Sequence, residues 1–181
     1  DMDPFDAREL RVLRFGYNSP FEEISLALYL RSKGISTISP LAGYMTGHRV
    51  EMADFLFDDS RYQRYRDLLN DDGTPVLRRD RAYMTLWGDW NRPDYEFGET
   101  EGSFHQRMSA LHAYRKNLIN EETYFDLMDQ MRSRLLQVGV EDLFPRGGHF
   151  LIALDSSGSM IRDQRGEPEL RLCNFELLKK L

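Results

Sequence analysis

The chain has 181 residues, of which 41% are hydrophobic and 30% charged, and its formal net charge is −6. These values predict a folded globular protein with one domain or two small ones. They argue against tight nonspecific binding to nucleic acid or anionic membranes. The one cysteine excludes an internal disulfide and is typical of the reducing cytoplasm, where we expect the protein. No apolar run approaches the roughly 20 residues of a membrane span. The first residue is Asp1 and not Met, which fits a piece of a longer protein.

In the first half, strand-like patterns surround one helix. The strand patterns lie at 9–17, 35–46 and 81–90. Ser19 predicts a helix start, because Pro20 follows it and Glu22 lies three residues after it, as in a capping box. Gly34 should end this helix. A short helix through Leu69 and a turn at 70–75 complete this half.

Helical spacing dominates the start of the second half. Residues 104–117 predict one helix, and Asn120 caps a second helix that ends at Gly139. The period then changes, and we expect a C-terminal β-hairpin with turns at Gly158 and Gly166. The prediction is an α+β fold, with strands and a helix in 1–92 and a helical pair plus terminal hairpin in 93–181.

This order of elements, ending in "CNFE", resembles the protein-kinase-like fold, in particular the small-molecule and lipopolysaccharide kinases. The resemblance would cover most of the chain, but few motifs match. It implies a nucleotide-binding domain that takes ATP and Mg²⁺ between the 9–90 segment and the hairpin. Arg14 stands where the family has a phosphate-contacting lysine, and Glu22 or Glu23 would be its partner, with Glu23 preferred.

The match is weaker at the positions that carry the chemistry. "GGHFLIALD" resembles the lipopolysaccharide-kinase segment in which a histidine, here His149, stands at a metal-binding position. Asn174 replaces the metal-binding aspartate, which removes a negative charge from the site. A kinase needs a base for the substrate hydroxyl. Phe144 lies five residues before His149, and a two-residue insertion would bring Asp142 into that role. The resemblance therefore implies a phosphotransferase or an inactive pseudokinase, the latter being preferred.

Two alternatives remain open. The first is a binding or assembly module without chemistry, whose hairpin packs on a protein partner. The second comes from "LIALDSSGSM", which resembles the opening of a von Willebrand factor A domain. There, Asp155, Ser157 and Ser159 would ligate a divalent cation. The same residues are typical of a turn, and a von Willebrand A domain takes further ligands from loops well downstream, whereas 21 residues follow Met160.

The remaining candidates have ordinary structural explanations. Trp87 and Trp90 suit packing more than ligand stacking. Cys173 lies among apolar neighbours and should be unreactive. The basic clusters at 61–66 and 78–81 are interpreted as solvated faces.

Overall fold

The computed structural model describes residues 14–50, 63–88, 106–163 and 165–181. It has the mixed helices and antiparallel strands of an α+β protein, which confirms the predicted fold class. Its elements are α2 (Pro20–Ser32), β1 (Ser39–Arg49), β2 (Arg81–Gly88), β3 (Gln106–Ser109), α4 (Ala110–Arg115), α5 (Glu121–Gln137), β4 (Val140–Asp142), β5 (Phe150–Leu154), β6 (Arg171–Leu172) and β7 (Leu178–Lys180).

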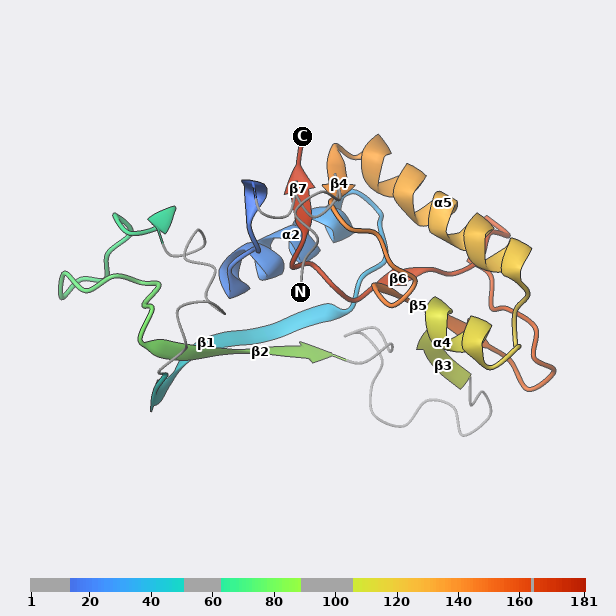
Figure 1. The fold of residues 1–181 in the computed structure, drawn as a ribbon, viewed down its shortest axis with the longest axis horizontal. Coiled ribbons are helices and arrows are strands. Elements are labelled where there is room, and N and C mark those ends of the chain that lie inside the picture. Colours follow the sequence, from blue (N-terminus) through green and yellow to red (C-terminus); the bar gives the residue numbers. More distant parts are fainter. Residues whose placement is uncertain (1–13, 51–62, 89–105, 164) are drawn as a thin grey trace.

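The strands form small antiparallel sheets (Figure 1). β1 and β2 make a long ribbon that lies beside α2. β3, β5 and β6 make a second sheet, in which β5 is the central strand. The short strands β4 and β7 pair with each other beyond it, next to the end of α5. The pair β5–β6 thus belongs to the second sheet, and the chain then continues into β7 of the third sheet.

Helix α2 forms for local reasons that the sequence displays. The Ser19 side chain accepts a hydrogen bond from the Glu22 N–H, and the Glu22 carboxylate accepts one from the Ser19 N–H, so the predicted capping box is present. Gly34 follows the helix with a φ of +81°, a conformation that suits glycine. The helix buries Leu26, Ala27 and Leu30.

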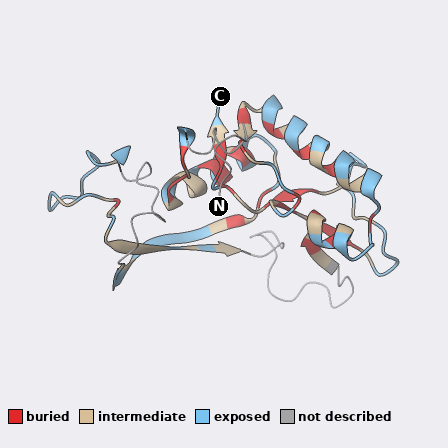
Figure 2. Cartoon of the chain, viewed as in Figure 1, coloured by how far each residue is buried: buried red, intermediate tan, exposed pale blue. Residues whose placement is uncertain are grey.

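One buried apolar cluster joins the two halves of the chain. Leu30 of α2, Leu127 and Leu135 of α5, and Phe150 and Leu172 of the second sheet all belong to it. Figure 2 shows buried residues on α2, on the inner face of α5 and along β5 and β6. Backbone bonds support this contact, because Ile38 donates to the carbonyl of Leu172 and Leu172 donates to that of Ser36.

The predicted strand at 9–17 is wrong over its described residues. Arg14 and Phe15 are helical, and Gly16 follows them with a φ of +66°. A glycine with positive φ commonly ends a helix, so Gly16 marks a helix end here and not a strand exit. Residues 9–13 lie outside the described residues.

Two further boundaries differ from the predictions because long-range pairing decides them. Residues 106–109 are strand β3 and not the start of a helix, since they pair with β5. Helix α4 begins only after Ser109, whose side chain accepts a hydrogen bond from the His112 N–H. In the terminal segment, β6 and β7 lie in different sheets, separated by a turn at 176–177. The helix expected before Leu69 falls largely in 51–62, outside the described residues.

Candidate functional site

Asp142 and His149 form a closely bonded pair beneath α5. Asp142 ends β4, and His149 immediately precedes β5. The His149 Nδ1 and Asp142 Oδ2 atoms are 2.8 Å apart, and the two side chains are only 12% and 8% exposed. The other carboxylate oxygen of Asp142 accepts a hydrogen bond from the Phe144 N–H. The pair lines a cavity of about 10 Å³, room for a single water molecule. Both oxygens of this carboxylate are therefore engaged within the protein.

Asn174 lies beside His149 because the backbone bonds them together. The His149 carbonyl accepts from the N–H groups of Cys173, at 2.8 Å, and Asn174, at 3.2 Å. The structure thus joins the backbone of Asn174 to that of His149, whose ring is bonded to Asp142. The Asn174 side-chain oxygen accepts a hydrogen bond from the Glu176 N–H at 3.1 Å, so it also stabilises the turn before β7.

These residues do not suit Mg²⁺. A hard dication prefers several oxygen ligands, with carboxylates among them. His149 Nδ1 is bonded to Asp142, and Asn174 contributes one neutral oxygen. Over the described ranges, no group of three or more His, Cys, Asp or Glu side chains is placed to hold a metal ion.

The residues expected to contact the nucleotide phosphates make other contacts in the structure. The Arg14 guanidinium is exposed and lies 5.3 Å from the ring centroid of its neighbour Phe15. Glu22 caps α2 and forms an ion pair with Arg64, whose Nη1 is 2.8 Å from Oε1. Burial raises the pKa of Glu22, but hydrogen bonds from Ser19 and Tyr65 and the charge of Arg64 outweigh it, so the net pKa is lowered. Glu23 is half-buried on α2.

Comparisons of the chain with family models, curated proteins and solved structures give no match. Within the described ranges, the structure has no helix long and apolar enough to cross a membrane.

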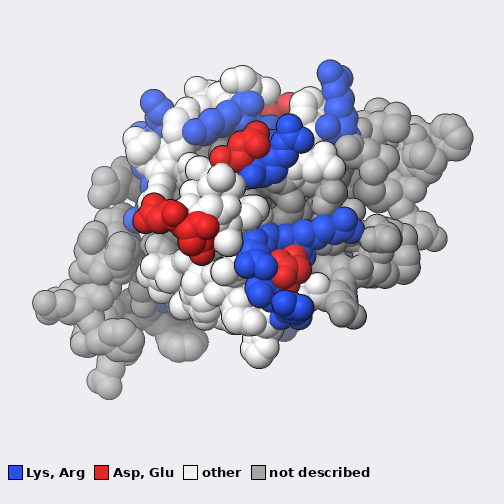
Figure 3. Space-filling model, turned by 90° about the vertical axis from the view of Figure 1, so that its left-hand side faces the viewer, with Lys and Arg blue, Asp and Glu red and all other residues white. Residues whose placement is uncertain are grey.

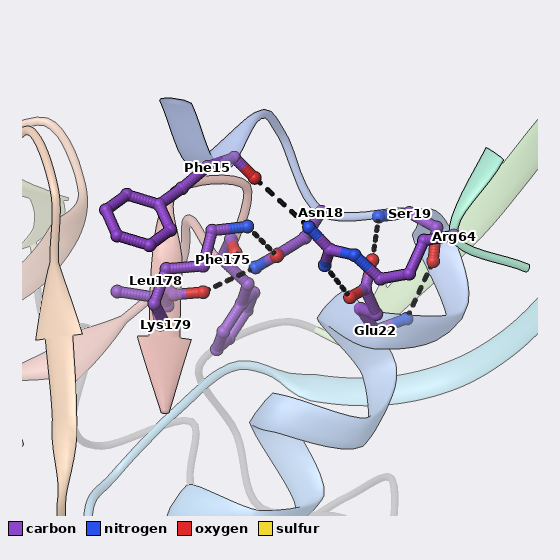
Figure 4. A network of polar contacts seen from close by, with 8 residues as sticks. All are labelled: Phe15, Asn18, Ser19, Glu22, Arg64, Phe175, Leu178 and Lys179. Carbon is purple, nitrogen blue, oxygen red and sulfur yellow. Dashed lines mark hydrogen bonds and ion pairs between the residues drawn. The ribbon is translucent and has the colours of Figure 1, made fainter. Parts of the chain in front are cut away.

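A buried polar link between the two halves of the chain was not predicted from the sequence. Asn18 is 2% exposed, and its amide donates to the carbonyl oxygens of Phe175 and Leu178, each at 2.7 Å. The Lys179 ammonium donates to the Asn18 side-chain oxygen, also at 2.7 Å. Figure 4 shows these contacts beside the capping box and Arg64. An asparagine after a strand-like segment indicates a turn, and nothing in the local sequence points to partners near residue 175.

Trp87, at the end of β2, stacks on Phe175. The ring centroids are 5.0 Å apart and the planes meet at 16°. The indole N–H donates to the Thr85 hydroxyl at 3.0 Å. Phe175 is 1% exposed, so this stack belongs to the core that joins β2 to the segment after β6. Trp90 lies outside the described residues.

The "DSSGS" segment has the contacts of a turn. One carboxylate oxygen of Asp155 accepts from the Ser157 N–H, the Ser157 hydroxyl and the Ser159 N–H, at 2.6 to 2.9 Å. Gly158 has a φ of +81°. Local bonding of this kind is the ordinary use of Asp and Ser in turns, and it occupies an oxygen that the cation hypothesis requires.

Proposed function

We propose that this chain is a kinase-like module that binds a nucleotide and does not transfer its phosphoryl group efficiently. The observation that carries the proposal is the placement of His149, which is bonded through its carbonyl to Asn174 and through its ring to Asp142. These are the positions at which the resemblance implies metal binding and proton transfer. The antiparallel β5–β6 and β4–β7 pairs that bring them together support the same proposal.

Inefficient transfer follows from the state of Asp142. A general base must reach the proton that it removes. The Asp142 carboxylate is almost fully buried, and its oxygens are bonded to His149 and to the Phe144 N–H. Asn174 stands where the family has a metal-binding carboxylate, and the residues Asp142, His149 and Asn174 do not suit Mg²⁺. Nucleotide binding should therefore not depend on this ion.

Thermal unfolding with ATP, ADP or GTP, each with Mg²⁺ or with EDTA, tests binding. A nucleotide at 100 times its Kd stabilises the folded state by about 2.7 kcal/mol. We expect equal stabilisation with Mg²⁺ and with EDTA. If no nucleotide raises the unfolding temperature, the nucleotide proposal is wrong, and a binding module without nucleotide becomes the better description.

Two variants test the chemistry. Asn174→Asp restores the missing carboxylate and keeps an oxygen for the Glu176 N–H, so Mg²⁺ should increase ATP stabilisation in this variant and not in the parent. Transfer of γ-phosphate to protein or hydroxyl acceptors should stay at background in the parent chain. The proposal of inefficient transfer would be contradicted if the parent chain transferred phosphate and Asp142→Asn lost this activity while keeping the same unfolding temperature.

A further inference from the structure

A cavity of about 980 Å³ lies between α5, the segment 33–36 after α2 and the residues 162–163 and 165–170 before β6. This volume is typical of a ligand-binding site. The buried side chains that line the cavity, Met131 and Leu170, are apolar. Most of the other lining side chains are charged or can form hydrogen bonds. A ligand that fits this cavity is therefore polar.

Most of the charged side chains that line the cavity are already bonded within the protein. These are Arg134, Arg162, Asp163, Glu167 and Glu169. Arg134 pairs with Glu167 at 2.7 Å, and this ion pair joins the last turn of α5 to the segment before β6. Glu169 pairs with Arg171 at 2.8 Å. Asp163 accepts hydrogen bonds from two backbone N–H groups, and Arg162 donates one to a backbone carbonyl at 2.7 Å. These side chains build the wall of the cavity.

Four lining charges have no ion pair or side-chain hydrogen bond with any part of the chain that the structure describes. Asp126 and Asp129 are exposed on α5, and their spacing of three positions places them on one face of the helix. Arg165 is exposed in the turn before β6. The Lys33 ammonium lies 5.6 Å from the ring centroid of Tyr29. The cavity thus offers two carboxylates and two cations to a ligand.

The two cations lie toward the end of α5, and the carboxylates lie earlier along this helix. Lys33 contacts the ring of Tyr29, whose hydroxyl donates to the Val138 carbonyl at 2.9 Å, just after α5. Arg165 lies two positions before the glutamate that pairs with the last turn of α5. Asp126 lies 12 positions before Val138, or about 18 Å along the helix axis. An extended peptide of about five residues spans this length.

Hydrogen-bonding side chains lie between the two charged ends. Gln130, Ser133 and Gln137 line the cavity from one side of α5. The Oε1 atom of Gln130 is buried and has no hydrogen-bond partner among the described residues. Buried acceptors are nearly always bonded. Rotation of this amide toward the cavity would let it accept from the N–H group of a ligand, so the lining suits a peptide backbone.

We propose that this cavity binds a short peptide with free ends. Its ammonium group contacts the two α5 carboxylates, and its carboxylate contacts Lys33 and Arg165. Five acidic and four basic side chains line the cavity, so a ligand of only one sign gains little net attraction. The inference is independent of the nucleotide proposal, because Asp142, His149 and Asn174 do not line this cavity.

Isothermal titration calorimetry with a neutral pentapeptide of alternating alanine and serine tests the proposal. At pH 6.5 the terminal ammonium, with an ordinary pKa of about 7.7–8.0, is protonated. Asp126→Asn/Asp129→Asn should raise Kd about fivefold, since exposed ion pairs are individually weak. The control Asp67→Asn/Asp71→Asn removes the same charge from exposed positions at the end of the molecule that Figure 3 faces, where acidic and basic side chains are mixed. Its Kd should stay near the parent value.

Lys33→Gln/Arg165→Gln tests the other end of the site. Its control is Arg115→Gln/Lys116→Gln, which removes one arginine and one lysine from exposed positions that do not line the cavity. We expect Kd to rise about fivefold in the first variant and to stay near the parent value in the control. Circular dichroism checks that each variant folds.

Peptides blocked at one end assign each contact. The acetylated peptide lacks the ammonium, so its Kd should be the same for the parent and for Asp126→Asn/Asp129→Asn, and should still rise in Lys33→Gln/Arg165→Gln. The amidated peptide should show the reverse pattern. No binding of the free peptide to the parent, or equal affinity for a peptide blocked at both ends, overturns the proposal. Displacement of the peptide by ATP assigns the cavity to the nucleotide and also overturns it.

Discussion

The side-chain amide of Asn18 donates a hydrogen bond to the carbonyl oxygen of Phe175 at 2.7 Å, across 157 positions of the sequence. A second bond from the same amide reaches Leu178, and Lys179 donates to the amide oxygen. Asn18 therefore bonds to two backbone carbonyl groups near the other end of the described chain, one just before β7 and one at its first residue, and it does so from the position just before the cap of α2.

Asn18→Ala should lower the free energy of unfolding by about 2–4 kcal/mol, since it removes the hydrogen bonds that the Asn18 side chain makes with Phe175, Leu178 and Lys179. Urea denaturation of the two proteins measures the difference. Asn70→Ala is the matched control, because Asn70 is exposed and bonds only within its own turn, so a change within about 0.5 kcal/mol is expected there. Equal effects of the two substitutions would show that the Asn18 contacts add no net stability.

Gly147 and Gly148 should respond oppositely to alanine. A Cβ at Gly147 would lie within 2.7 Å of the Tyr124 hydroxyl and nearer still to its ring, whereas a Cβ at Gly148 would meet no heavy atom within 4 Å. Because overpacking forces neighbours to move, Gly147→Ala should cost about 1–3 kcal/mol, and Gly148→Ala should be nearly neutral. Thermal unfolding distinguishes them, and equal unfolding temperatures would contradict the close contact.

The contribution of Glu22 to stability should decrease in acid. Burial opposes ionisation, but the Ser19 and Tyr65 hydrogen bonds and Arg64 keep the folded-state pKa of Glu22 below the ordinary value of 4.5. The contribution is therefore complete above the unfolded pKa and is lost as the pH falls through the folded one. The stability difference between the parent and Glu22→Gln should be largest near neutral pH and shrink below about pH 4.5. Denaturation at several pH values measures it, and a difference independent of pH would contradict the assignment.

Cys173 should be unreactive in the folded protein. Burial raises the pKa of the Cys173 thiol to about 11. At pH 8, three units lower, about one thiol in a thousand is a thiolate, which is the reactive form. Disulfide-exchange reagents should label Cys173 slowly in buffer and rapidly in denaturant. Labelling at the same rate in both conditions would show that the thiol is accessible.

Local chemistry made much of the fold predictable. The "SPFEE" segment contains its own capping partners, and Asn120 caps α5 by accepting from the Thr123 N–H, three residues away. Gly158 and Gly166 adopt the positive φ that their turns were expected to need. Strand β3 could not be predicted in this way, because its partner β5 lies more than 40 positions away and overrides the helical spacing of 104–117.

The candidate site stays a prediction, and its contacts could not be derived from the sequence. Asp142, His149 and Asn174 were chosen from an order of elements, and the strand pairs bring them together. The bond between Asp142 and His149 depends on how the segment between β4 and β5 turns, and no local pattern determines it. Arg14 was placed on a strand from alternation over a few residues, a pattern that did not exclude a helix.

The long separation between Asn18 and its partners has a consequence for folding during synthesis. While the ribosome makes the chain, α2 can cap itself with Ser19 and Glu22, but the core beside it lacks the Leu172 and Phe175 side chains until those residues have been added. Contacts between distant residues are slow to form because closing a long loop costs entropy. Nascent chains halted before residue 172 should therefore hold an exposed apolar surface on α2, a surface on which chaperones would act.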